Sequence, residues 1–488
     1  MKKTKIEGKQ LRALGYPESP VISMAMKVVK EHFRFEPLED VLVKLKAVLD
    51  EPGEFVNDPI LGGIAAHLMP PVPDASQVAL NTSGIGFAVY GRDHIEEGAL
   101  HQMHIAAKLP VAVGGALMPD AHHGYGLPIG GVLATDNAVI PYGVGVDIGC
   151  RMCLSIFDLD PKELVQKENY FAREINEATL FGSGAQFTRP ADHAVMEHKA
   201  FDELPLLRSL QGKAWKQLGS SGSGNHFVEF GVVEISEQDN ILNVPAGKYV
   251  GLLSHSGSRG LGANIANHYT RLAKDIRRLP GEASNLAWFT LDESAGQEYW
   301  ISMNLAGDYA SACHHVIHDK IARQLGRKPL TRVENHHNFA WKEFIQDEQG
   351  QKREVIVHRK GATPAGRDVL GIIPGSMTAD GFIVKGKGER RSIQSASHGA
   401  GRKMSRSAAM KSVTHSALRE ELEKHGVKLL GGGLDEAPFA YKDIRDVMKS
   451  QVDLVDVVGR FTPKIVKMDG TAPKPWRKKK ETGGVDGE

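Results

Sequence analysis

Four segments rich in possible metal ligands most constrain how this chain can fold. Each places a carboxylate, thiol or imidazole group beside an apolar run, and glycine flanks three of them; they are residues 143–150, 219–229, 253–260 and 336–338. Glycine lets the backbone approach a ligand closely, and a mixed Asp, Cys and His set suits a borderline metal such as Zn, Mn, Fe or Co. If these segments serve one site, the chain between them cannot be divided into independent domains.

Asp147 and Cys150 are the strongest candidates in the first segment. A carboxylate and a thiol three residues apart can converge on one metal ion, and a thiolate can bridge two. Cys150 also forms a Cys-x-x-Cys pair with Cys153, a spacing found in redox-active dithiols and in half zinc sites. The chain has three cysteines and no second such pair, so the pair alone is weak support for either role.

Histidine recurs in the other three segments, as His226, His255 and the adjacent pair His336 and His337. Neighbouring side chains diverge, so at most one of the pair is expected to enter a given site. A single histidine is more often a structural residue than a ligand. The recurrence of possible metal ligands in four segments therefore predicts one shared metal site.

A fifth segment, residues 395–402, places His398 directly before Gly399-Ala400-Gly401 and ahead of a predicted helix around Met410. Small residues expose the backbone, and the N-terminus of a helix attracts phosphate. His398 could act there as a base, a ligand or a nucleophile on phosphorus. A tight turn with a structural histidine is the alternative. Residues 147 to 398 then have to meet in one pocket.

Composition limits the function classes. Lys plus Arg number 60 and Asp plus Glu 59, which leaves a net charge of +1, so a nucleic-acid site must be a local patch. The basic N-terminus has no apolar run behind it, and no stretch suits a membrane span. With few cysteines as well, we expect a cytoplasmic protein without a membrane partner.

The pattern along the chain predicts a mixed α/β fold with three parts. Residues 1–80 form an N-terminal helical extension, residues 81–470 one catalytic body with mixed sheets around a single site, and residues 471–488 a basic, disordered tail. Within the body, residues 249–253 and 355–357 are predicted strands, and the chain between 263 and 345 looks helical.

These segments, in their order along the sequence, resemble those of the RtcB family of RNA ligases. The match covers about residues 80 to 470 and includes residues 118–122, 126–131, 145–150, 224–227, 255–259, 337–338, 358–362, 374–377, 397–401, 435–438, 441–444 and 453–455. The resemblance implies an enzyme that joins RNA ends bearing a 2′,3′-cyclic phosphate or 3′-phosphate to a 5′-hydroxyl end, using GTP and two Mn²⁺ ions, in RNA repair or tRNA processing. An activating protein partner is possible for such an enzyme.

The same resemblance assigns roles to individual residues. It implies that His398 is the nucleophile that takes up GMP, and that the metal ligands are Asp147, Cys150, His226, His255 and His337, with Cys150 as the bridge. Glu229 resembles the carboxylate that recognises guanine, and Tyr441 a stacking partner for the base. The other implied nucleotide and phosphate contacts are Asn225, Asn338, Pro374, Gly375, Ser376, Met377, Gly399, Ala400 and Gly401.

Two positions depart from the family pattern and put the preference for guanine in doubt. Gly381 stands where the family commonly has a serine that holds the base, and Asp469 stands where it has a lysine on guanine. They motivate an alternative reading, a metal-dependent phosphodiesterase or end-healing enzyme that opens the cyclic phosphate without sealing. A non-catalytic binding protein is a third reading, which the presence of His398 and all implied metal ligands disfavours.

The near-neutral charge leaves RNA binding to a few basic residues near the site. They are Arg259, Lys360, Arg402, Lys403 and Arg406. Four further histidines, His122, His123, His336 and His358, are expected at most to support the site or to contact RNA.

Overall fold

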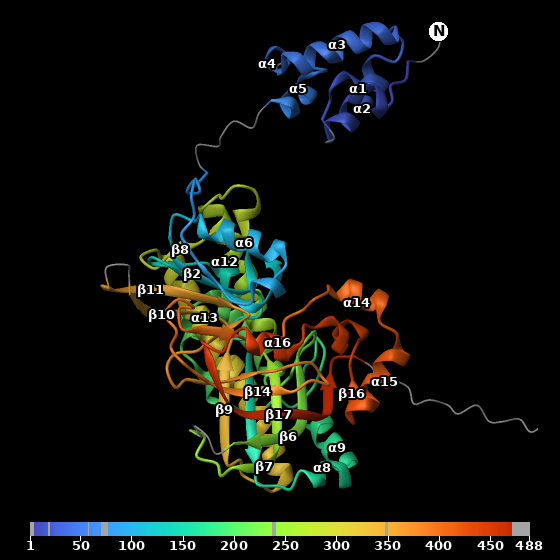
Figure 1. Cartoon of the computed structure of the whole chain (residues 1–488). Coiled ribbons are helices and arrows are strands. Elements are labelled where there is room, and N and C mark those ends of the chain that lie inside the picture. The colour runs from blue at the N-terminus through green and yellow to red at the C-terminus, as the bar shows by residue number, and fades with distance from the viewer. Residues whose placement is uncertain are drawn as a thin grey trace, which may run out of the picture. The chain divides into compact units, whose positions relative to one another are not determined.

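The computed structural model describes residues 4–17, 20–56, 58–69, 77–236, 241–346 and 350–470. The chain forms two compact units, residues 1–77 and residues 78–488 (Figure 1). The predicted basic tail, residues 471–488, lies outside the described residues. Within the described ranges, no helix combines the length and the apolar character that a membrane span would need.

The first unit consists of helices, as the sequence predicts. They are α1 (Gly8–Leu14), α2 (Pro20–His32), α3 (Leu38–Asp50), α4 (Pro52–Phe55) and α5 (Gly62–Leu68). Val41, Leu45 and Val48 of α3 are fully buried, together with Val21 and Ala25 of α2. Because residues three and four positions apart share one face of a helix, this spacing produces a common apolar core.

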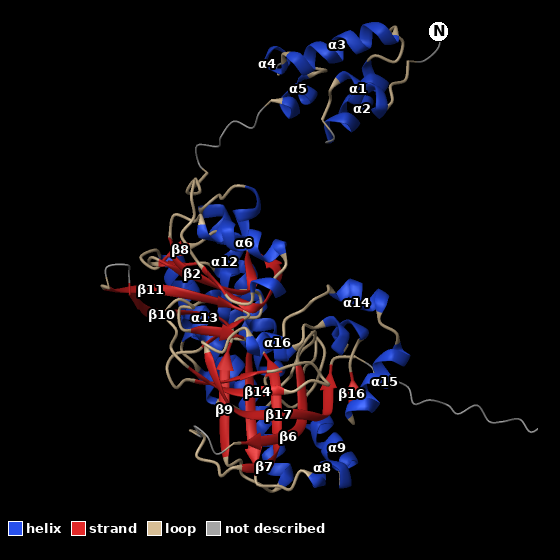
Figure 2. Ribbon diagram, in the orientation of Figure 1, coloured by secondary structure: helices blue, strands red, loops and turns tan. Residues whose placement is uncertain are grey.

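The second unit combines two large sheets with helices, which confirms the mixed α/β class (Figure 2). The five-stranded sheet has the order β1 (Ala88–Val89), β2 (Ala112–Tyr125), β3 (Leu127–Thr135), β11 (Lys352–Lys360), β10 (Asn338–Gln346). Two short ladders join β12 (Ala362–Pro364) to β15 (Ser395–Ser397) and β4 (Ala138–Val139) to β8 (Phe289–Thr290).

The larger sheet positions the site. Its order is β13 (Leu370–Ile373), β14 (Gly381–Gly386), β17 (Val455–Met468), β6 (Phe227–Ile235), β7 (Gly247–Ser256), β5 (Arg151–Phe157), β9 (Thr331–His336), and β16 (Lys428–Gly431) pairs with β17. Strands β6, β7, β5 and β9 are antiparallel neighbours. The end of one therefore lies beside the start of the next, and loops distant in sequence meet at one edge.

Helices cover these sheets. The long helix α13 (Ser294–Leu325) packs against β5 and β7, and α9 (Glu168–Ala178) against β6 and β17. The remaining helices of this unit are α6 (Glu97–Ala107), α7 (Pro141–Val144), α8 (Lys162–Gln166), α10 (Ala200–Glu203), α11 (Pro205–Gln217), α12 (Arg259–Ile276), α14 (Arg406–Ser412), α15 (His415–His425) and α16 (Ile444–Lys449), with short 3₁₀ turns between them.

The predicted strands over residues 249–253 and 355–357 lie inside β7 and β11. The helical prediction over residues 263–345 is correct for α12 and α13. It is wrong for Phe289–Thr290, which form β8, and for residues 331–346, which contain β9 and β10. Residues 331–336 alternate between buried and more exposed positions, which is the two-residue period of a strand. Val333 is the single apolar residue among these six, so the sequence does not show that period.

Buried neutral histidines make the fold sensitive to acid. Burial lowers the pKa of His314 to about 3 and that of His358 to about 4, from an ordinary value of 6.5. The unfolded chain binds these protons first, so stability is full above pH 6.5 and falls by about 1.4 kcal/mol per pH unit for each such histidine below it. We expect the urea midpoint to fall between pH 7 and pH 5, and less so in His358→Gln. An unchanged midpoint would contradict this expectation.

Candidate functional site

One cavity of about 750 Å³ collects the predicted site residues. Every residue that the resemblance assigns to metal, nucleotide or catalysis lines it, although these residues come from positions 147 to 441. They are Asp147, Cys150, Asn225, His226, Glu229, His255, His337, Asn338, Pro374, Gly375, Ser376, Met377, His398, Gly399, Ala400, Gly401 and Tyr441. The structure thus brings the five segments together.

The sheet accounts for this convergence. Cys150 directly precedes β5, His226 directly precedes β6, and His337 directly follows β9, while His255 is the penultimate residue of β7. In the antiparallel register, residue 255 is the partner of residues 152 and 227. The four side chains therefore project from one edge of the sheet into one space.

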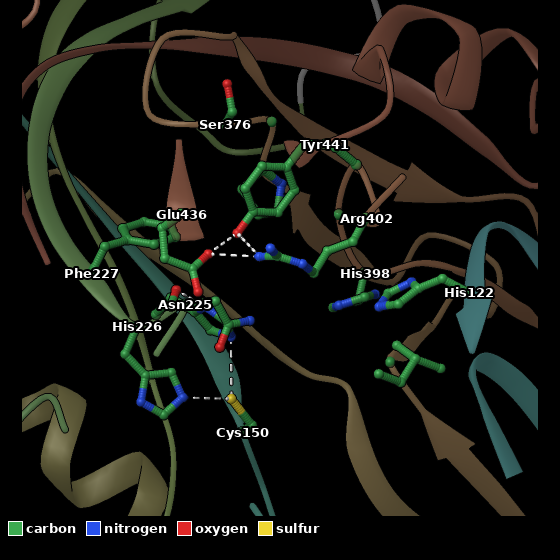
Figure 3. Close-up of a pocket in the computed structure, with 18 of the residues that line it drawn as sticks. His122, Cys150, Asn225, His226, Phe227, Ser376, His398, Arg402, Glu436 and Tyr441 are labelled. Atoms are coloured by element: carbon green, nitrogen blue, oxygen red, sulfur yellow. Dashed lines mark hydrogen bonds and ion pairs between the residues drawn. The ribbon is translucent and has the colours of Figure 1, made fainter. Parts of the chain in front are cut away.

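The donor atoms of these side chains lie close together. Cys150 Sγ is 3.4 Å from His226 Nε2 and 3.2 Å from His255 Nε2, and the Nε2 atoms of His255 and His337 are 3.2 Å apart. Asp147 Oδ2 lies 2.9 Å from His226 Nε2. Figure 3 shows Cys150 and His226 facing each other at the floor of the cavity. Cys150 belongs to both donor groups, one with His255 and His337 and one with Asp147 and His226.

The hydrogen bonds and protonation of these side chains suit the binding of a divalent cation. His255 Nδ1 lies 3.0 Å from the Asn225 carbonyl oxygen, to which it donates, so Nε2 is the atom left to bind. Burial and the neighbouring imidazoles hold the pKa values of His255 and His337 well below the ordinary range, which keeps both rings neutral. Burial and Asp147 raise the pKa of the Cys150 thiol. A cation would reverse that shift, because metal-bound cysteine is deprotonated.

Asp147 is held at this edge by a glycine loop. Its Oδ1 accepts a hydrogen bond from the Ser258 backbone N–H at 3.1 Å. A Cβ atom on Gly257 would lie 2.1 Å from Asp147 Oδ1. The glycine is therefore required by the close approach of the carboxylate to this loop.

His398 lies in the same cavity and is oriented by a residue that the sequence did not single out. Its Nδ1 is 2.6 Å from Asp120 Oδ2, which also accepts the His398 backbone N–H. Burial alone would raise the pKa of Asp120, but His398 outweighs it and the pKa is lowered. The carboxylate thus fixes the proton on Nδ1, which leaves the lone pair of Nε2 free in the cavity.

The Asp120 contact depends on the loop after His398. Gly401 has φ +72°, and a Cβ atom there would lie 2.1 Å from the Asp120 carbonyl oxygen. In the sequence, Asp120 stands out as an acidic residue within a weakly charged stretch. In the structure its side chain is fully buried in β2. Its pairing with a residue 278 positions away cannot be seen in the sequence.

Glu436 also lines the cavity and was not singled out in the sequence. The Tyr441 hydroxyl donates to its carboxylate, which also pairs with Arg402 (Figure 3) and with Arg406. The Arg402 guanidinium lies 5.2 Å from the centre of the Tyr441 ring. This buried carboxylate therefore fixes both a predicted base-stacking ring and two cations near the predicted phosphate loop.

Part of the cavity lining is apolar and contains one acid. Phe227, Phe461 and Met468 line the cavity together with Glu229 and Gly381. Burial alone raises the pKa of Glu229 well above its ordinary range, with no contribution from a hydrogen bond or charge among the described residues. Asp469, which the resemblance placed against the base, does not line the cavity, because β17 turns the side chain of Met468 toward it instead.

The predicted basic residues differ in accessibility. Arg402, Lys403, Arg406 and Lys360 all line the cavity, but the Lys360 side chain is buried, and its ammonium donates to the Tyr125 and Tyr142 carbonyl oxygens at 2.5 and 3.2 Å. Burial lowers the pKa of Lys360 to about 7. Arg259 contacts His226 Nδ1 at 2.8 Å. Among the additional histidines, His122 and His123 line the cavity and His336 and His358 do not.

Comparison with known proteins places this site in a family. The family model for the tRNA-splicing ligase RtcB matches residues 102–469. The RNA-splicing ligase RtcB of Escherichia coli is 33% identical over 410 residues, which cover 75% of this chain and 92% of that protein. The tRNA-splicing ligase RtcB of Nanoarchaeum equitans is 30% identical over 437 residues, with 75% and 91% covered. The chain belongs to the RtcB family of RNA ligases.

Proposed function

We propose that this enzyme joins RNA ends bearing a 2′,3′-cyclic phosphate or 3′-phosphate to 5′-hydroxyl ends through a covalent His398–GMP intermediate, with two Mn²⁺ ions, in RNA repair or tRNA processing. The main observation behind this proposal is that His398 and a cluster of Asp, Cys and His donors line the same cavity. Asp120 accepts a hydrogen bond from Nδ1 of His398, so Nε2 is left to face the cavity. The family supports RNA ligation, and the geometry supports this nucleophile.

The proposed chemistry starts at His398 Nε2. Its lone pair attacks the α-phosphorus of GTP, a P–N bond forms, and pyrophosphate leaves. The Nδ1 proton stays between the ring and Asp120, whose negative charge stabilises the positive charge that develops on the imidazole. An oxygen of the RNA 3′-phosphate, formed by opening the cyclic phosphate, then displaces Nε2. Finally the 5′-hydroxyl attacks that 3′-phosphate and GMP leaves.

The residues proposed to hold Mn²⁺ are Asp147, Cys150, His226, His255 and His337. Bound metal would supply charge neutralisation for the phosphate oxygens, which phosphoryl transfer needs more than acid or base catalysis. The neutral imidazoles and the shared thiol support two adjacent ions with Cys150 between them. The apolar part of the cavity lining would take the base.

Glu229 is proposed to recognise guanine. Burial alone favours the neutral acid of Glu229, but two N–H groups of a bound guanine would stabilise the ionised carboxylate, which accepts both hydrogen bonds. Adenine cannot supply donors in that pattern. Glu229→Gln is expected to reduce labelling of the protein by GTP about 100-fold and to narrow its advantage over ATP. Labelling with each of the four nucleotides measures both effects. Glu234→Gln is the control, because Glu234 lies on the same strand, is half-buried and does not line the cavity. An unchanged GTP preference would contradict this role.

The joining reaction is tested with two RNA fragments, one ending in a 2′,3′-cyclic phosphate and one starting with a 5′-hydroxyl. We expect a sealed product only when both GTP and Mn²⁺ are present. If the cyclic end is opened but never sealed under any nucleotide, the chain is a phosphodiesterase or end-healing enzyme. A product formed without nucleotide would contradict the covalent intermediate.

A further inference from the structure

The back of the metal-binding edge is unexpectedly polar. Strand alternation turns His255 toward the cavity and its neighbour Ser254 toward helix α13. His314 and His318 lie one turn apart on α13 and are fully buried against these strands. A helix normally packs on a sheet through apolar side chains, so this polar layer requires a reason.

A continuous chain of hydrogen bonds runs through the layer. His314 Nε2 lies 3.2 Å from the Ser256 carbonyl oxygen, which can only accept, so this nitrogen donates. His314 Nδ1 then accepts from the Ser254 hydroxyl at 2.6 Å. That hydroxyl has no second proton, so it accepts from His318 Nε2 at 2.7 Å.

The chain of hydrogen bonds continues across β5 to β9. His318 Nδ1 accepts from the Ser155 hydroxyl at 2.8 Å, and Ser155 Oγ accepts from Arg332 Nε at 3.3 Å. Both ring nitrogens of each histidine and both hydroxyls are thereby satisfied. Because a carbonyl oxygen ends the chain on one side and a guanidinium on the other, the direction of every bond is fixed.

The thiol of Cys153 approaches the same two imidazoles, which raises the possibility of a metal ion. The hydrogen bonds argue against it. All four ring nitrogens of His314 and His318 already have partners at 2.6–3.2 Å, namely the Ser256 carbonyl oxygen and the Ser254 and Ser155 hydroxyls. No ring nitrogen is therefore left for a metal ion. Cys153 and Cys150, three residues apart on either side of the strand start, thus serve opposite faces.

A second set of bonds anchors the turn that carries Cys150. Arg151 donates to the carbonyl oxygens of Gly149 and Gly307, at 3.4 and 3.0 Å, and pairs with Glu334 at 3.4 Å. Glu334 also binds His315 of α13 at 2.5 Å. The starts and ends of β5, β7 and β9 are therefore tied to one helix by directional bonds, which a shift of α13 by one turn would break.

We propose that this polar layer, formed by Arg151, Ser155, Ser254, His314, His318 and Glu334, is a positioning device that holds Cys150 and His255 in their metal-binding arrangement. Packing by apolar side chains would bury the helix equally well but would tolerate small slips. A fully satisfied hydrogen-bond chain fixes one register. The inference rests on the proposed metal site.

The test is the affinity of the full chain for Mn²⁺ alone, measured by the electron paramagnetic resonance signal of free Mn²⁺. We expect Ser254→Ala, which interrupts the chain of hydrogen bonds at its centre, to weaken Mn²⁺ binding about tenfold. Ser302→Ala is the matched control, because Ser302 is also fully buried and lies on α13, but its hydroxyl bonds to the Glu298 carbonyl oxygen and to Tyr269 rather than to the polar layer. If Ser254→Ala does not fold, Ser155→Ala breaks the same chain farther from the ligands and should weaken binding in the same direction.

Two results would overturn the inference. One is equal Mn²⁺ affinity in the wild type, Ser254→Ala and Ser155→Ala. The other is a metal equivalent that purified wild type contains and Cys153→Ala lacks, since the layer would then be a metal site. A wild-type chain that binds no Mn²⁺ would instead contradict the proposed metal site, and with it this inference.

Discussion

Replacing His398 by alanine is expected to abolish labelling of the protein by GTP and to reduce RNA sealing by at least about 10⁴-fold. The reason is that Nε2 of His398 is the proposed atom that bonds to phosphorus, and Asp120 prepares it by holding Nδ1 at 2.6 Å. Sealing of a cyclic-phosphate end to a 5′-hydroxyl end, followed on a denaturing gel, measures the loss.

The control for this variant is His268→Ala. His268 is exposed on α12 and does not line the cavity, so its removal should change neither labelling nor sealing. His398→Ala should still bind Mn²⁺ as the wild type does, because His398 is not among the proposed ligands. Sealing that persists in His398→Ala would show that the covalent step takes place elsewhere.

Replacing Cys150 by alanine is expected to have the second largest effect, a loss of about 10³-fold in sealing together with weaker Mn²⁺ binding. Cys150 is the donor shared by both groups of possible ligands, with two imidazole nitrogens at 3.2 and 3.4 Å from its sulfur. Its removal would take an anionic ligand from both proposed metal positions at once. Elemental analysis and sealing assays measure the two effects.

Cys313→Ala provides the matched comparison for Cys150. Cys313 is a fully buried cysteine on α13 and does not line the cavity. Its replacement should lower thermal stability through lost packing but leave the metal content unchanged. If Cys150→Ala retained full metal content and full sealing, Cys150 would not be a ligand.

The residues of the candidate site could be predicted from the sequence because they are grouped in short motifs. Asp147 and Cys150 share one turn, and His398 directly precedes the glycines that let the backbone approach Asp120. Each motif carries its chemistry and its conformational requirement within a few residues. The antiparallel register of β5, β6, β7 and β9 then brings the motifs together.

The partners of these motifs could not be predicted, because they come from distant parts of the chain. Asp120 and His398 are 278 residues apart. The layer under His255 depends on helix α13, whose histidines have nothing in their own sequence that identifies the strand they face. Likewise, residues 331–346 look helical in isolation and become strands because β5 and β11 supply hydrogen-bond partners.

The most direct measurement of the central claim is the mass of the wild-type protein after incubation with GTP and Mn²⁺, followed by proteolysis to locate any adduct. The proposed function predicts one added GMP, bonded to the peptide that contains His398, and no addition when Mn²⁺ is withheld. An adduct on another residue, or none with any of the four nucleotides while RNA is still sealed, would contradict it.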